Sequence, residues 1–184
     1  MIKTQLEGNA IKVLQYVQEK PACHLRQIKN DLKISIGSAQ YHLFQLEKIG
    51  RITSVRRGLY KFYFPSGIFQ NKEKSILEVL NHETTRDLLL FIIEQRNPTH
   101  TDIVNYLGIS SSSVNWHTTR LIELQIIYET KDGKYRRYQI SHECRYFVVS
   151  LLKNYYNNIW ERWSSKLAEM FLSLAEDETT SKSQ

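Results

Sequence analysis

Hydrophobic and polar positions follow the same order twice along this chain, at a constant separation of 75 residues. The register holds without a gap from Ile28 to Tyr63 of the first copy. A constant register of this kind predicts that one small domain occurs twice. The identical pairs are Ile28 and Ile103, Asn30 and Asn105, Leu32 and Leu107, Ile34 and Ile109, Ser35 and Ser110, Ser38 and Ser113, His42 and His117, Leu46 and Leu121, Ile52 and Ile127, Gly58 and Gly133, Tyr60 and Tyr135, and Tyr63 and Tyr138.

Each copy predicts three helices followed by a β-hairpin. Apolar residues at helical spacing predict the first two helices, and Ser35 or Ser110 then stands where a helix N-cap is expected. The third helices are predicted over 36–49 and 111–124. Strand-like runs around turns at 57–58 and 132–133 predict the hairpins. The fold class is therefore mainly α with small β-hairpins. The predicted divisions are a first domain over 1–66, a second over 67–140, an amphipathic C-terminal helix over 141–176 and a flexible tail over 177–184.

The predicted C-terminal helix carries one broad apolar stripe. At 1.5 Å per residue it would be on the order of 50 Å long, which exceeds the width of a small domain. We therefore expect part of the stripe to pack against the same helix of a second chain in a homodimer. The predicted dimer contacts are Leu152, Tyr155, Ile159, Trp163, Leu167 and Met170.

The net charge of +6 is carried by the first copy. Residues 1–70 hold 11 Lys and Arg against 4 Asp and Glu, whereas 71–140 hold 9 of each and 141–184 hold 5 and 6. A basic domain suits a polyanionic partner such as nucleic acid. Two cysteines make no disulfide scaffold, and neither an apolar leader nor a membrane-spanning run is apparent. We expect a cytoplasmic protein without a membrane partner.

The third helices carry few charges on their outer faces. On a helical wheel, aliphatic residues and His42 or His117 face inward, so both histidines are expected to be structural. The opposite faces carry small, amide-bearing and aromatic side chains such as Gln40, Tyr41 and Asn115. Amides can hydrogen-bond base edges, and small residues allow close approach to a groove. The cations lie on the hairpins instead, as expected where one element reads bases and its neighbour holds phosphates.

Residues 35–52 and 110–127 share the order small, Ser, aliphatic, polar, aromatic, His, and they resemble the recognition-helix region of winged helix-turn-helix transcription regulators of the ArsR and MarR type. Two such domains in one chain are similar to predicted archaeal regulators. The resemblance covers about residues 10–140. It implies sequence-specific binding of double-stranded DNA, with the third helix in the major groove and the hairpin, or wing, on phosphates. The groove-facing residues it implies are Gly37, Ser38, Gln40, Tyr41, Gln45, Ser112, Ser113, Asn115, Trp116, Thr119 and Arg120. The wing cations are Arg56, Arg57, Lys61, Lys131, Lys134, Arg136 and Arg137.

Two other hypotheses stay open at this point. One is a protein-interaction module in which the second domain binds a component of the transcription machinery or an assembly scaffold. The other is a regulator that responds to a metal or a small molecule. Cys23–His24 and His142–Cys144 offer two ligands each, fewer than a structural zinc site needs, so no metal site or cofactor is predicted. Paired carboxylates, a phosphate-binding glycine loop and a nucleophile triad are missing from the sequence, which predicts that the protein is not an enzyme.

Overall fold

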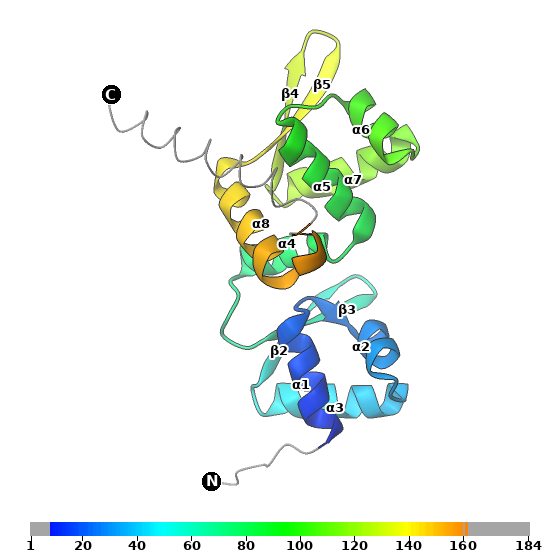
Figure 1. Ribbon diagram of the computed structural model, residues 1–184, viewed down its shortest axis with the longest axis vertical. Helices are drawn as coiled ribbons and strands as arrows, with labels where there is room; N and C mark the ends of the chain where they lie inside the picture. Colours follow the sequence, from blue (N-terminus) through cyan, green and yellow to red (C-terminus); the bar gives the residue numbers. More distant parts are fainter. Residues whose placement is uncertain (1–7, 160, 162–184) are drawn as a thin grey trace, which may run out of the picture. The chain divides into compact units, whose positions relative to one another are not determined.

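The protein is mainly helical with small antiparallel sheets, as the sequence predicts (Figure 1). The computed structural model describes residues 8–159 and 161, and the chain divides into two units, Met1–His82 and Glu83–Gln184. The first unit contains α1 (Asn9–Glu19), β1 (Cys23–His24), α2 (Leu25–Leu32), α3 (Ile36–Lys48), β2 (Ile52–Arg57), β3 (Tyr60–Pro65) and α4 (Asn71–Leu80). The second contains α5 (Glu83–Gln95), α6 (His100–Leu107), α7 (Ser111–Glu123), β4 (Ile127–Asp132), β5 (Tyr135–Ile140) and α8 (His142–Tyr155).

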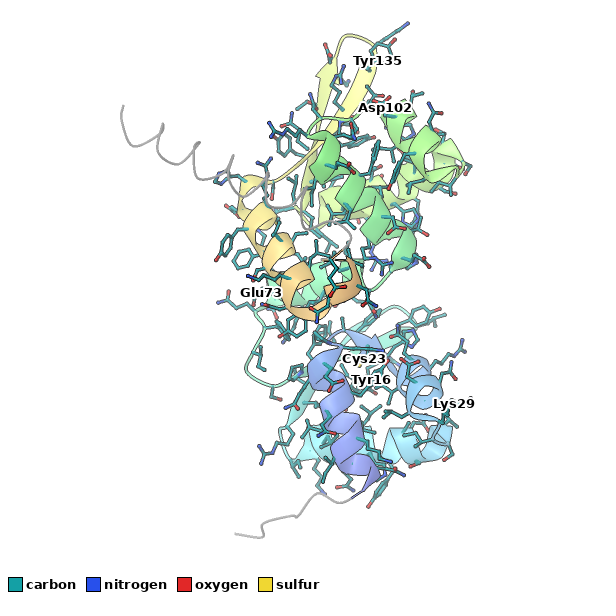
Figure 2. All side chains as sticks on the ribbon, viewed as in Figure 1. Tyr16, Cys23, Lys29, Glu73, Asp102 and Tyr135 are labelled. Atoms are coloured by element: carbon teal, nitrogen blue, oxygen red, sulfur yellow. The ribbon has the colours of Figure 1, made fainter. Side chains whose placement is uncertain are left out.

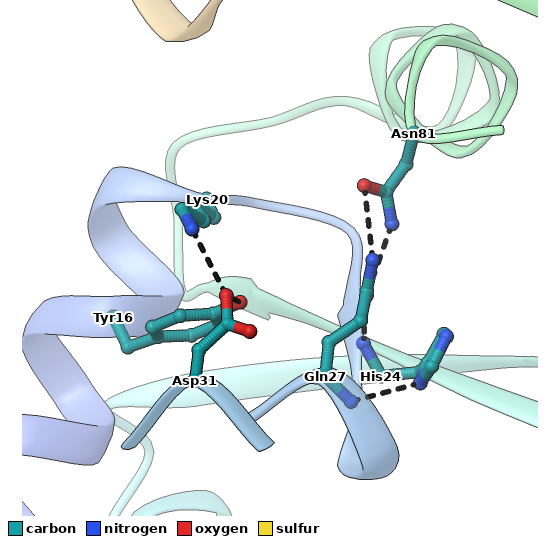
Figure 3. Close-up of polar contacts among 6 residues, drawn as sticks. All are labelled: Tyr16, Lys20, His24, Gln27, Asp31 and Asn81. Carbon is teal, nitrogen blue, oxygen red and sulfur yellow. Dashed lines mark hydrogen bonds and ion pairs between the residues drawn. The ribbon is translucent and has the colours of Figure 1, made fainter. Parts of the chain in front are cut away.

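The core of the first unit lies between its first three helices and its sheet. Val13 of α1, Ile28 of α2 and Leu46 of α3 are fully buried in it. Apolar residues at helical spacing on the three helices meet here, which is the packing that amphipathic helices require. At the edge of this core, Tyr16 Oη donates to Asp31 Oδ2 at 2.6 Å, and Lys20 Nζ reaches the same oxygen at 3.0 Å (Figure 3).

The sheet of the first unit has three strands in the order β1-β3-β2. The sequence predicts only the β2–β3 hairpin, because the two-residue β1 is too short to give an alternating pattern. In its described residues the second unit has the β4–β5 hairpin as its one named sheet, and an isolated bridge joins Thr99 to Arg137 where the first unit has β1.

The chain reversals on either side of the third helices use the same backbone in both units. After α2 and α6 the left-handed position is Lys33 (φ 52°) in the first unit and Gly108 (φ 63°) in the second. After α3 and α7 it is Gly50 (φ 71°) and Gln125 (φ 56°). A non-glycine residue pays roughly 1 kcal/mol for this conformation. The two units therefore share the same backbone conformation at both reversals, although the glycine stands at a different reversal in each unit.

The structure places α4 in the first unit, whereas the sequence assigns residues 67–82 to the second domain. Polar contacts of Asn81 and Glu78 tie this helix and its C-cap to the first unit. Asn81 Nδ2 donates to Ala22 O at 2.9 Å. It also donates to Gln27 Oε1 at 3.2 Å (Figure 3). Arg57 Nε donates to Glu78 Oε2 at 3.2 Å. These contacts join residues far apart in the sequence, so local patterns do not reveal them. The sequence therefore placed the domain boundary at the Pro65–Gly67 turn, before α4, whereas the structure has it after α4.

The predicted continuous helix over 141–176 is interrupted. α8 ends at Tyr155, and Tyr156 leaves the helical conformation with φ −133° and ψ 54° before 157–159 become helical again. Tyrosine and asparagine have modest helix propensity, and Tyr156 is followed by two asparagines. Leu152 and Ile159 are already buried within the single chain, and Tyr155 is half-buried. The other predicted dimer contacts, Trp163, Leu167 and Met170, lie outside the described residues.

Candidate nucleic-acid interface

The outer faces of α3 and α7 are exposed and nearly uncharged, and they carry large aromatic side chains among small and amide-bearing ones. Tyr41 and Phe44 of α3 are each 60% exposed, and Trp116 of α7 is 56% exposed. Phe44 was not among the predicted contacts, although its wheel position signalled it. Of the predicted groove-facing residues, the exposed ones are Gly37, Gln40, Tyr41, Ser112, Ser113, Asn115, Trp116 and Thr119, and the half-buried ones are Ser38, Gln45 and Arg120.

The inner faces of the same helices belong to the cores. His117 is buried, and its Nδ1 lies 2.9 Å from Thr85 Oγ1. This contact confirms the structural role expected of His117, and His42 is half-buried at the matching position. A histidine anchored on the inner face fixes how the helix is rotated, and therefore which side chains it presents outward.

Both helices begin at the predicted serine caps. Ser35 Oγ accepts from the Ser38 amide at 3.1 Å, and Ser110 Oγ accepts from the Ser113 amide at 3.2 Å. The caps satisfy amides that would otherwise lack partners in the first turn. They also leave the short side chains of this turn exposed, where a phosphate or base edge can approach closely.

The β2–β3 hairpin of the first unit, which we call the first wing, has two different faces. Arg56 and Lys61 are cross-strand partners and share one face. On that face Lys61 Nζ pairs with Glu47 Oε2 of α3 at 2.7 Å. On the other face Arg57 pairs with Glu78, whose side chain is 2% exposed. Among the described residues, Arg56 has no acidic partner within ion-pair distance. It is therefore the cation of this wing that can bind a phosphate without first breaking an ion pair.

The β4–β5 hairpin, which we call the second wing, distributes its cations in the same way. Arg136 Nη1 donates to Asn115 Oδ1 of α7 at 3.2 Å and lies 3.8 Å from Glu129. Arg137 pairs with Asp132 at 2.8 Å. Lys131 and Lys134 have no ion pair within the described part of the chain, and Lys134 lies over the ring of Tyr135, which Figure 2 shows near the end of this hairpin.

The contact between Arg136 and Asn115 limits the hydrogen bonds that Asn115 can offer to a partner. An asparagine recognises adenine by offering one acceptor and one donor together. Here the acceptor oxygen of Asn115 is engaged by the guanidinium. Gln40, at the matching position of α3, is exposed and has no such contact in the described chain. Of these two matching side chains, Gln40 is therefore the one whose amide oxygen and nitrogen are both available in the described chain.

The two cysteines are buried and unpaired. Burial raises the pKa of the Cys23 thiol to about 12, which makes it a poor metal ligand and a poor nucleophile at neutral pH. Within the described ranges, no three His, Cys, Asp or Glu side chains gather in a way that could hold a metal ion. None of the helices described is long and apolar enough to span a membrane.

Two histidines contact the starts of helices, and the contact made by His24 needs a neutral ring. His24 Nδ1 accepts from the Gln27 amide at 3.3 Å and caps α2 (Figure 3). His100 Nε2 lies 2.9 Å from Ser111 Oγ at the start of α7. Burial, with Arg26 nearby, lowers the pKa of His24 below its ordinary 6.5. Burial, with Arg136 nearby, does the same to the pKa of His100.

We expect the protein to lose stability as the pH falls below about 6.5. Because folding lowers both pKa values, the unfolded chain binds these protons more readily. The stabilisation is complete above the unfolded pKa and is lost as the pH drops toward the folded values. Urea titrations at pH 7.5 and 5.5 measure the loss. The variant His24→Asn with His100→Gln, in which asparagine keeps a cap that does not titrate, should show a smaller loss. An equal loss in wild type and variant would contradict the assignment.

Residues 9–77 match a family model described as an N-terminal HTH domain. The chain is also similar to an uncharacterized HTH-type transcriptional regulator of Methanocaldococcus jannaschii, with 24% identity over 146 residues. That alignment covers 79% of this chain and 36% of the relative, so the chain spans about a third of the relative's length. The first unit is therefore similar in sequence to a helix-turn-helix domain over residues 9–77.

Two solved structures show a weaker likeness. HlyU from Vibrio cholerae has a TM-score of 0.41 at 18% identity, covering 46% of this chain and 91% of that chain. The MepR–DNA complex of Staphylococcus aureus has a TM-score of 0.40 at 18% identity, covering 56% and 89%. At these TM-scores neither likeness bears on how this chain acts.

Proposed function

We propose that the protein is a transcription regulator with two winged helix-turn-helix domains, and that its first domain binds double-stranded DNA sequence-specifically. The observation that carries this proposal is the exposed, uncharged face of α3 beside a wing whose Arg56 has no acidic partner in the described chain. Gln40 and Gln45 supply amides for base edges, and Tyr41 supplies an apolar contact for a thymine methyl or a sugar. The HTH match over residues 9–77 and the archaeal HTH-type relative support the same function.

Arg56 is expected to supply a phosphate contact that the protein makes with any sequence. Arg56→Ala should weaken binding to all duplexes and flatten the log–log salt dependence of the binding constant by about 0.9. The measurement is a gel-shift titration in graded salt. Lys131→Ala, at the matching position of the second wing, tests whether that domain also touches DNA. Lys12→Ala on α1 controls for the loss of one positive charge.

An unchanged slope for Arg56→Ala would remove the wing from the proposed interface. Failure of the wild-type protein to retard DNA at low salt would overturn DNA binding itself. Selection of bound sequences from a random pool would then define the operator, and its half-site spacing would report the geometry of the proposed homodimer.

A second candidate function concerns the second unit. Its α7 exposes Trp116, while Arg136 engages Asn115 and Asp132 engages Arg137. A large exposed aromatic beside an asparagine whose oxygen is already engaged, on a stretch (71–140) with no net charge, favours a protein partner over DNA. Such a partner would belong to the transcription machinery. Trp116→Ala should then abolish capture of that partner without changing the DNA affinity of the first domain, whereas an effect on DNA affinity alone would assign α7 to the operator.

A further inference from the structure

The tip of the first wing presents a large apolar side chain to solvent. Leu59 is 94% exposed, and its neighbour Tyr60 is 52% exposed. Single exposed leucines are ordinary on protein surfaces. This one differs in its position, because it occupies the outermost loop of a hairpin that also carries Arg56.

The turn explains why Leu59 lies at the tip. The last paired residues are Arg57 and Tyr60, so the loop is Gly58-Leu59 and not the Arg57-Gly58 turn that the sequence predicts. Gly58 takes φ 57° at the first loop position, and Leu59 is not among the residues with positive φ. This is the type II′ arrangement, which matches the twist of the strands and makes a tight, defined hairpin end.

The base of the tip is packed. The Tyr60 ring lies 5.9 Å from the His24 ring and 6.3 Å from the Phe62 ring, measured between centroids. An aromatic support of this kind restricts the hairpin end, so Leu59 is presented on a fixed platform. The second wing lacks the apolar tip, because Lys134 stands at the position that matches Leu59.

We propose that Leu59 is a wedge that the first wing inserts between two base pairs in the minor groove, so that the protein kinks the DNA it binds. The proposal rests on the DNA-binding function proposed above. Apolar side chains on minor-groove binders unstack base steps and bend the duplex in this way. The occupant is nucleic acid because the tip is apolar while Arg56 beside it, and the surplus of positive charge over residues 1–70, match a polyanion. The wing packs on α3 through Lys61 and Glu47, so its tip is set to reach the groove beside that helix.

The probe is an alternating TA duplex of about 30 base pairs, since TA steps are easily unstacked, with 2-aminopurine at its central adenines and a fluorophore pair at its ends. Wild-type protein should raise 2-aminopurine fluorescence and bend the duplex by about 20–90°. Leu59→Ala should abolish both signals with the salt slope unchanged. For Leu59→Ala, the ratio of affinities for the TA duplex and for a stiff A-tract duplex should fall on the order of tenfold relative to wild type.

Leu59→Lys is the matched control, since it gives the first wing the tip of the second. It adds a cation, so overall affinity should rise while the bend is still lost. Leu59→Met should retain the bend. The exposure of Leu59 makes these variants harmless to folding.

The outcomes separate the two proposals. No retardation of either duplex by wild-type protein would overturn the DNA-binding function. Binding without a fluorescence increase, or with Leu59→Ala indistinguishable from wild type, would overturn the wedge alone. If Leu59→Ala changes only the sedimentation coefficient of the free protein, the tip is a self-association contact and the wedge is wrong.

Discussion

Leu46→Ala should lower the free energy of unfolding of the first unit by about 3 kcal/mol. Leu46 is fully buried on the inner face of α3 and belongs to the core cluster with Val13 and Ile28. Truncation removes its transfer free energy and leaves a cavity that close-packed neighbours fill only in part. Domains of this size are stable by only about 5–15 kcal/mol, so the loss is a large share of the total. DNA affinity should fall with it, because the same core holds α3 in place.

The two units can be followed separately in the full chain. All three tryptophans, Trp116, Trp160 and Trp163, follow residue 83 in the sequence, so tryptophan fluorescence reports the second unit. Far-ultraviolet circular dichroism reports both units. Leu46→Ala should shift a dichroism transition in urea and leave the fluorescence transition in place. Leu121→Ala, the fully buried equivalent on α7, should shift the fluorescence transition.

Phe44→Ala is the surface control on the same helix. Phe44 is 60% exposed, so its removal should change stability by less than about 0.5 kcal/mol while weakening DNA binding. Comparing Leu46→Ala with Phe44→Ala distinguishes loss of the fold from loss of a DNA contact. Equal urea midpoints for Leu46→Ala and wild type would show that the core of the first unit is not organised around α3.

Local features of the fold could be predicted from the sequence. Helical periodicity placed His117 and Leu121 inward and Tyr41 and Trp116 outward, and the structure confirms those faces. Periodicity succeeds here because each face is determined within a few turns of one helix. It failed at Tyr156, because a stripe of apolar residues continues through a residue that leaves the helix.

The pairing of the wing cations could not be predicted from the sequence. Lys61 and Glu47 are 14 residues apart, and Arg57 and Glu78, like Arg136 and Asn115, are 21 apart. Such contacts depend on how the hairpin packs against the helices. The seven predicted wing cations therefore look equivalent in the sequence, although only three of them lack an ion pair among the described residues.

The turn type of the first wing could not be predicted from the sequence either, because the two candidate turns differ by only one residue in strand register. A glycine in a two-residue hairpin loop serves either as the second loop residue of a type I′ turn or as the first of a type II′ turn. The sequence around Gly58 allows both, and the strand register decides for the second. This shift by one residue moves Leu59 from a strand to the tip, which is why sequence reasoning missed it.

Arg57→Met should lower the free energy of unfolding of the first unit by about 2 kcal/mol, which is more than expected of a surface arginine. The Glu78 side chain is 2% exposed, and Arg57 supplies its ion-pair partner at 3.2 Å. Removing Arg57 breaks an ion pair to a buried carboxylate, and breaking a pair in which both partners are fully buried costs about 3–5 kcal/mol. The Arg57 side chain is 49% exposed, so water offsets part of that loss.

The double variant Arg57→Met with Glu78→Met should recover most of the stability, because two apolar side chains replace the pair and the buried carboxylate is removed. Circular dichroism in urea measures all three proteins, and the salt dependence of DNA binding is recorded beside it. For Arg57→Met that slope should stay at the wild-type value, in contrast to Arg56→Ala. A single variant as stable as wild type, with a slope flattened by about 0.9, would instead make Arg57 a phosphate contact. In that case DNA would have to draw Arg57 away from Glu78, and binding would weaken by the free energy of the broken pair.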